Sequence, residues 1–189
     1  MLKAFFILAA GLALGIGSAD ALLRQGSPFG VVAVGAWRFA TGDGTADADP
    51  YARAALARVG EIPLALGEGL RLTARVDDDG AKLNPACVYV VGPRAPPARY
   101  WTLEIADRDG YPMNNPAGRS VFRSGELLRA GTGEFAIRVS AEAEPGNWLP
   151  IGRREGFQLI LRLYDTPLSA VGDDIQRSAA PHVTKERCR

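Results

Sequence analysis

Three short groupings place an aromatic ring beside a basic or amide side chain, and they are the residues best suited to chemistry. They are Arg99-Tyr100-Trp101, Asn147-Trp148-Leu149-Pro150 and Arg162-Leu163-Tyr164. An indole ring stacks on a ligand and a guanidinium binds an anion, so such residues can line a pocket. We therefore predict a ligand-binding site that uses Arg99, Trp101, Trp148, Arg162 and Tyr164. In the alternative interpretation the tryptophans pack in the core and Arg162 pairs with a carboxylate such as Glu104.

Other reactive residue types form weaker patterns. His182 is the single histidine, which excludes multi-histidine metal sites, and it has no partner arrangement typical of a hydrolase. The run Asp77-Asp78-Asp79-Gly80 could supply calcium ligands, but it lacks the later acidic residue of an EF-hand and suits a hairpin turn better. The sequence therefore assigns no catalytic residue, no metal ligand and no cofactor.

The overall charge argues against nucleic acid as a partner. The chain has 22 basic and 21 acidic residues, for a net charge of +1 among 189 residues. Proteins that bind nucleic acid through its phosphates need a basic surface. We expect the partner to be a small molecule or a component of the cell envelope instead.

The N-terminus is typical of a targeting segment. Lys3 is followed by an apolar and small-residue run, and Ala19-Asp20-Ala21 fits the pattern recognised by signal peptidases. Residues 1–21 therefore form a signal peptide, or a transmembrane anchor that extends to Leu23. Either alternative predicts an exported protein, periplasmic or anchored to the inner membrane with its domain outside the cytoplasm.

Export changes the interpretation of the cysteines. Cys87 and Cys188 are the only two in the chain. Because an exported protein folds in an oxidising compartment, we predict a disulfide that attaches the C-terminal tail to a strand. The alternative is a buried Cys87 and an unbonded Cys188.

The elements that must position these residues are mostly strands. The 22 glycines and 13 prolines are 35 of the 189 residues, or about 19%, against a usual share of about 12%. This excess favours short strands joined by turns. A helix is predicted from Asp49-Pro50 to Gly60, and a turn of helix after Ser124 and a last short helix from Thr166-Pro167 are also expected. Apolar alternation predicts strands over residues 70–76, 87–91, 100–107, 135–139 and 157–164, and the tail from Ser178 to Arg189 is expected to be polar. We expect a mainly β, jelly-roll-like β-sandwich with one or two short helices, in a single domain over residues 24–189.

At the same aromatic groupings the chain resembles the bacterial envelope family called domain of unknown function 1214 (DUF1214). The resemblance runs from about Trp37 to Asp165, with Thr102 where relatives often have serine. The pieces that carry it are Asp49-Pro50-Tyr51, Asp79-Gly80, Cys87-Val88-Tyr89, Ala98 to Leu103, Asn147 to Pro150 and Leu161 to Asp165. The resemblance implies a jelly-roll-like sandwich in the cell envelope, in the short form without the second β domain (unknown function 1254) of longer relatives. It implies no catalytic residues.

Three functions are consistent with these observations. The first is an envelope protein that binds a ligand or serves as an accessory module. The second is an enzyme acting on a small or carbohydrate-like substrate through carboxylate and arginine residues such as Glu104 and Arg162. The third is a structural envelope protein without a small-molecule site. Sandwich folds host unrelated activities, so the fold alone does not choose among them.

Overall fold

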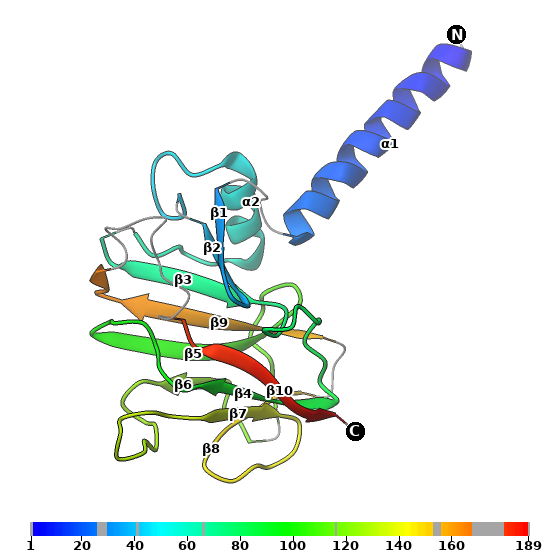
Figure 1. The fold of residues 1–189 in the computed structure, drawn as a ribbon. Helices are drawn as coiled ribbons and strands as arrows, with labels where there is room; N and C mark the ends of the chain where they lie inside the picture. The colour runs from blue at the N-terminus through cyan, green and yellow to red at the C-terminus, as the bar shows by residue number, and fades with distance from the viewer. Residues whose placement is uncertain are drawn as a thin grey trace.

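The chain folds into two β-sheets, two helices and connecting turns (Figure 1). The computed structural model describes residues 2–25, 30–40, 42–65, 67–115, 117–152, 156–167 and 180–188. The elements are α1 (Leu2–Gln25), β1 (Val31–Val34), β2 (Trp37–Ala40), α2 (Pro50–Val59), β3 (Gly69–Ala74), β4 (Cys87–Gly92), β5 (Tyr100–Asp107), β6 (Val121–Arg123), β7 (Ile137–Ser140), β8 (Asn147–Pro150), β9 (Phe157–Tyr164) and β10 (His182–Cys188).

The strands divide into a six-stranded and a four-stranded sheet. The larger sheet has the order β1-β2-β3-β9-β5-β6, and the smaller has the order β10-β4-β7-β8. All neighbouring strands are antiparallel except β7 and β8, which are parallel. The sheets pack against each other in a sandwich, and no closed barrel occurs in the described part of the chain (Figure 1). The predicted mainly β sandwich is confirmed.

The core lies between the two sheets because successive residues of a strand point to opposite faces. On β9, Leu159, Leu161 and Leu163 are fully buried, and the smaller sheet contributes Ile137 and Leu149 to the same cluster. β9 lies between β3 and β5, as its apolar residues on both faces predict. The outer face of β9 carries Arg162 and Tyr164, which are half-buried.

The helix α2 forms for the reasons that its sequence indicates. The Asp49 carboxylate accepts a hydrogen bond from the Ala52 amide at 3.0 Å, and Pro50 occupies the first helical position. Gly60 ends the helix at a φ of 66°, a left-handed conformation that suits glycine. The predicted helix from Asp49-Pro50 to Gly60 is confirmed.

The disulfide prediction is also confirmed. Cys87 and Cys188 are bonded, at a sequence separation of 101 residues. The bond joins the first residue of β4 to the last residue of β10. Closing a loop of this length stabilises the fold by about 4.7 kcal/mol in the chain-entropy model.

The tail differs from its prediction. Residues 182–188 are predicted as part of a polar tail and instead form β10, which pairs with β4 along its length. Only Val183 on this strand is buried, so the alternation that identifies a strand is missing from the sequence. The start of β10 is held by the Trp37 indole, which donates to the Pro181 carbonyl at 2.6 Å, and by the Asp78 amide, which donates to the Val183 carbonyl at 3.0 Å.

Smaller differences concern short elements. The sequence does not predict β2, β6 and β8, because three or four residues are too few for a periodic pattern. The turn of helix expected after Ser124 is wrong: this segment is a hydrogen-bonded turn in which the Glu126 amide donates to the Arg123 carbonyl. The last short helix expected from Thr166-Pro167 falls mostly on residues outside the described part of the chain.

The N-terminal segment is helical throughout. Residues Leu2–Leu23 are long and apolar enough to cross a membrane, with a mean hydropathy of 1.9. α1 extends away from the sandwich (Figure 1). This helix could serve as a signal or as an anchor, as the sequence predicts.

Candidate functional site: a charged cluster and a groove beside the disulfide

The five predicted ligand-binding residues lie on different surfaces of the sandwich. Trp101 points into the core, where its ring centroid is 5.2 Å from that of Phe135. Trp148 is half-buried on β8 of the smaller sheet, and Arg162 and Tyr164 face outward from β9 of the larger sheet. Strand parity therefore separates Trp101 from Arg162 and Tyr164 across the larger sheet.

Arg99 and Tyr164 lie toward one end of the larger sheet. Arg99 is mostly exposed and pairs with Asp165 at 3.1 Å. Tyr164 lies opposite Tyr100 in the strand register, and the two ring centroids are 5.8 Å apart. Arg99 and Tyr164 thus contact neighbouring side chains of the protein. Their role in ligand binding stays a prediction.

Arg162 belongs to a charged cluster on the outer face of the larger sheet. Its guanidinium donates to Glu104 through Nη1 and to Glu61 Oε1 through Nη2, the latter at 2.8 Å. Arg71, its partner in the strand register, contacts the same Glu61 Oε1 through Nε at 2.8 Å. The pairing of Arg162 with Glu104, expected in the alternative interpretation, is present.

The electrostatics of this cluster follow from burial and from the shared carboxylate. Burial lowers the pKa of Arg71, because it disfavours the charged form, and Glu61 only partly opposes this effect. Burial also acts on Arg162, but hydrogen bonds and charges of Glu61 and Glu104 outweigh it and raise the pKa. Burial raises the pKa of the Asp43 carboxyl, against the opposing charge of Arg71.

A small cavity lies beside two of these charged residues. A cavity of about 20 Å³ is lined by Asp43 and Arg71 together with residues 63–64 and 69–70. A space of this size accommodates about one water molecule. The cluster therefore functions as an ion-pair clamp that attaches the segment after α2 to β3, β9 and β5.

A larger hollow lies on the smaller sheet beside the disulfide. This groove has a volume of about 320 Å³ and is lined by residues 84–88, 140–142, 144 and 187–188. Pro85, Ala86 and Val88 supply an apolar wall, and Glu142, Glu144 and Arg187 supply charge. Pockets that bind small ligands begin at about 300 Å³, so this groove is large enough for one.

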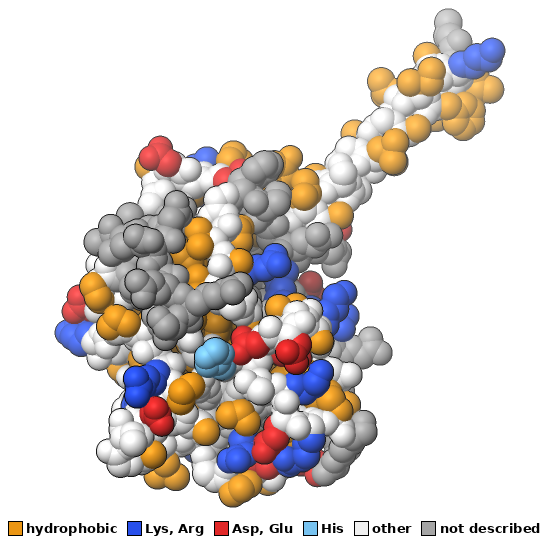
Figure 2. All heavy atoms as spheres, viewed as in Figure 1, with side chains coloured by type: hydrophobic (Ala, Val, Ile, Leu, Met, Phe, Trp, Pro, Cys, Tyr) orange, Lys and Arg blue, Asp and Glu red, His pale blue; other side chains and the backbone are white. Residues whose placement is uncertain are grey.

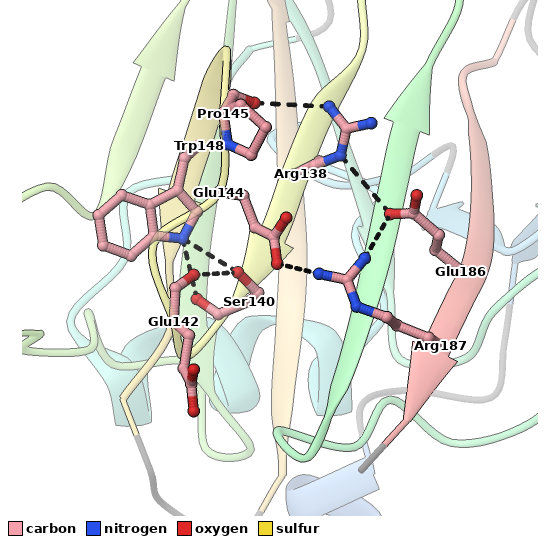
Figure 3. A network of polar contacts seen from close by, with 8 residues as sticks. All are labelled: Arg138, Ser140, Glu142, Glu144, Pro145, Trp148, Glu186 and Arg187. Carbon is pink, nitrogen blue, oxygen red and sulfur yellow. Dashed lines mark hydrogen bonds and ion pairs between the residues drawn. The ribbon is translucent and has the colours of Figure 1, made fainter.

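A polar network borders the groove (Figure 3). Glu144 is nine-tenths buried and accepts a hydrogen bond from Arg187, which also contacts Glu186 at 3.4 Å. The Trp148 indole donates to the carbonyl and the hydroxyl of Ser140, at 3.2 and 3.1 Å. Of the five predicted ligand-binding residues, Trp148 is the one that contacts a residue of the groove wall.

Asp77 and Asp78 of the acidic run make contacts that hold a turn and a strand in place. Asp77 and Gly80 close the predicted hairpin turn, since the Gly80 amide donates to the Asp77 carbonyl at 2.9 Å. His182 pairs with Asp78 at 2.9 Å and so attaches β10 to this turn. Within the described residues, no group of three or more histidine, cysteine or acidic side chains is arranged to hold a metal ion.

Comparison with protein-family models identifies the chain. The model for the protein family of unknown function DUF1214 matches residues 68–168, which span β3 to β9. The chain belongs to the DUF1214 family. The match includes Glu104, Arg162 and most of the groove, whereas Glu61 and the whole of β10 lie outside it.

The fold of this DUF1214 protein is similar to that of a solved structure. The VPA0106 protein from Vibrio parahaemolyticus matches 99% of this chain with 20% sequence identity and a TM-score of 0.59, and the match covers 46% of that protein. An uncharacterised protein from Burkholderia cenocepacia matches 64% of this chain with 18% identity and a TM-score of 0.41, and the match covers 30% of that protein. The DUF1214 chain thus spans less than half the length of these proteins. No curated protein matches it.

Sequence reasoning missed the residues that complete both sites of this DUF1214 protein. Glu61, which connects Arg71 to Arg162, follows a helix end and has no motif of its own. Glu144 lies in the turn-rich segment before β8, and Arg187 lies in the tail predicted to be polar. The adjacency of Arg187 to Cys188 is the signal that could have located it, because the predicted disulfide brings Cys188 to Cys87.

Proposed function

We propose that this DUF1214 protein is an exported cell-envelope module that binds a small, positively charged ligand in the groove beside the disulfide. The observation that carries the proposal is the nine-tenths buried carboxylate of Glu144 in the wall of a groove of about 320 Å³. A buried carboxylate that faces a hollow favours a cation with hydrogen-bond donors.

The lining of the groove supports a cation rather than an anion. Glu142 and Glu144 contribute two negative charges and Arg187 contributes one positive charge. The Arg187 guanidinium is about half exposed and already donates to Glu144, so an incoming amine or guanidine would take over the contact that Arg187 makes. Pro85, Ala86 and Val88 would cover the apolar part of the ligand.

The proposed location outside the cytoplasm rests on two independent features. The first is the apolar helix α1, whose length and hydropathy suit a signal or an anchor. The second is the disulfide between Cys87 and Cys188, since disulfides persist in oxidising compartments. Together they support the periplasm or the outer surface of the inner membrane.

The geometry favours this function over the two others. An enzyme that used Glu104 and Arg162 needs space for a substrate, but these side chains bind each other and Glu61, and the nearby cavity measures about 20 Å³. A purely structural protein needs no hollow for a metabolite, whereas the groove has about 320 Å³.

The test is a thermal-shift screen of the disulfide-bonded protein. The probes are small alkyl amines and alkylguanidines, with alkyl carboxylates of the same chain lengths as a comparison. A ligand present at 100 times its Kd adds about 2.7 kcal/mol of stability, which raises the Tm measurably. We expect amines or guanidines to raise the Tm and carboxylates to leave it unchanged.

The matched variants are Glu144→Gln and Glu126→Gln. Glu126 pairs with Arg123 on the exposed edge of the larger sheet, so its loss should leave the ligand-induced shift intact. Glu144→Gln should abolish the shift. The proposal is wrong if carboxylates stabilise the protein as well as amines do, or if the shift persists in Glu144→Gln.

A further inference from the structure

The apolar helix α1 is exposed over most of its length. None of its membrane-length segment is buried against the rest of the chain, and large side chains such as Phe5, Ile7 and Leu14 are more than three-fifths exposed. Figure 2 shows these apolar side chains along the projecting helix. The 22 residues of this segment match the roughly 20 that span the hydrocarbon core of a bilayer.

The base of α1 is attached to the folded domain. Asp20 pairs with Arg58 of α2 at 2.7 Å, and the residues around Asp20 are partly buried there. The helix continues without interruption through Ala19-Asp20-Ala21 to Gln25. A protease binds its substrate in extended form, so the continuous helix through this pattern disfavours cleavage of the folded chain.

The attachment places one surface of the domain beside the base of the helix. This surface includes the side of α2 that carries Tyr51 and Arg58, and the exposed Ile62 that follows the helix. Ile62 is 90% exposed, the largest value for a large hydrophobic residue in the described chain, and it lies four positions after Arg58. Tyr111 extends this surface, since its hydroxyl donates to the Arg58 carbonyl at 3.0 Å and its ring is 46% exposed.

The composition of this surface suits a lipid headgroup layer. Tyrosine is enriched at membrane interfaces, where its ring is buried and its hydroxyl is hydrated. Arginine binds lipid phosphates, and an exposed isoleucine gains stability by entering the boundary of the acyl chains. An isoleucine of such exposure has no role in the fold, because it contacts little of the protein.

We propose that α1 is retained as a membrane anchor and that the surface formed by Tyr51, Arg58, Ile62 and Tyr111 rests on the phospholipid headgroups around it. The pairing of Asp20 with Arg58 places α2 close to the end of the apolar segment, and therefore close to the membrane surface. The proposal rests on the anchoring part of the proposed function and is independent of the groove, so either can fail without the other.

The first measurement is the N-terminal sequence and mass of the protein recovered from both the membrane and the soluble fractions of the expressing cells. We expect a chain that retains residues 2–21. A mature chain that begins at Leu22 overturns the proposal.

The second measurement locates Ile62 relative to the lipid. Ile62→Cys and, as a matched control, Leu128→Cys are labelled with a nitroxide in the full chain, without reductant so that the native disulfide stays closed. Leu128 is 70% exposed and lies between β6 and β7 in the sequence. These two strands lie at the end of the sandwich away from α1 (Figure 1). The labelled proteins are reconstituted in bilayers of phosphatidylethanolamine and phosphatidylglycerol.

Collisions with oxygen report lipid exposure, and collisions with a water-soluble nickel chelate report water exposure. We expect the label at position 62 to collide with oxygen several-fold more, relative to nickel, than the label at position 128. Equal nickel accessibility of the two positions in bilayers overturns the proposal.

Discussion

Glu61 and Arg162 are 101 positions apart in the sequence, yet their side chains are joined by a hydrogen bond of 2.8 Å. Glu61 follows α2, and Arg162 lies on the central strand β9. The same carboxylate oxygen contacts Arg71 on the neighbouring strand β3, also at 2.8 Å. Two arginines that the strand register places side by side therefore share one carboxylate, and this side chain attaches the α2 segment to the sheet.

Replacing Glu61 with glutamine should destabilise the protein. Without the Glu61 carboxylate, Arg71 and Arg162 are still neighbours in the strand register. Among the described contacts, Glu104 is then the carboxylate that still binds Arg162. Because the carboxylate is only 13% exposed, the expected loss of unfolding free energy is about 2 kcal/mol, between the values for surface and buried pairs. Urea unfolding measures it, with Glu126→Gln, which breaks an exposed pair, expected to leave the stability nearly unchanged. A loss for Glu61→Gln as small as that of the control would contradict the clamp.

Asp43 should make stability depend on pH in a defined direction. Burial raises the pKa of its carboxyl in the folded state, with the charge of Arg71 opposing this effect. The protonated carboxyl is thus favoured by folding, so this contribution to stability is complete below the unfolded-state pKa of about 4 and is lost as the pH rises through the folded-state pKa. Asp43→Asn should remove this contribution to the pH dependence. The stability of the variant relative to the native protein should therefore increase as the pH rises from acidic to neutral. Unfolding free energies measured from acidic to neutral pH test this, and a difference between the two proteins that does not change with pH would refute it.

The sequence predicts the parts of this fold that depend on local patterns. The strand over residues 157–164 is apolar on both faces and lies in the centre of a sheet, and Asp49-Pro50 and Gly60 define α2. The bounds of β5 and β9 agree with the predicted ranges because their alternation extends over eight residues each. The disulfide is predicted from the oxidising compartment that the targeting segment implies, and not from a residue pattern around the cysteines.

The parts that could not be predicted depend on contacts between distant segments. β10 has one buried side chain and is a strand because β4 offers it a free edge. The groove is assembled from three separate segments, and its buried carboxylate, Glu144, lies in a turn-rich region without a motif. The predicted ligand site grouped residues by their neighbours in the sequence, whereas strand parity sends Trp101 and Arg162 to opposite faces of one sheet.

Trp101 and Arg99 should behave very differently although they are two residues apart. Trp101 is 5% exposed and packs on Phe135, so Trp101→Ala should cost about 3–5 kcal/mol of unfolding free energy. Arg99 is 79% exposed, and Arg99→Ala should change the stability by under about 0.5 kcal/mol. Denaturant unfolding of both variants measures the contrast. A small loss for Trp101→Ala would show that its ring is not part of the core and would favour the predicted ligand role.

Removing the disulfide should loosen β10 in a graded manner. Trp37 and Asp78 hold the beginning of this strand through Pro181 and Val183, whereas Cys188 holds its end. The double variant Cys87→Ser, Cys188→Ser should lose about 2–5 kcal/mol of stability. Hydrogen exchange should accelerate most at residues 185–188 and least near Val183, because the end of the strand loses its covalent attachment.

The same change should weaken binding in the groove, because Arg187 and Cys188 form part of its wall. Any amine that raises the Tm of the native protein should raise that of the double-serine variant less. Reductant added to the native protein should reproduce the faster exchange, whereas reductant added to the variant should have no effect. Uniform exchange along β10, unchanged by loss of the bond, would show that pairing with β4 alone holds the strand and that the disulfide does not shape the groove.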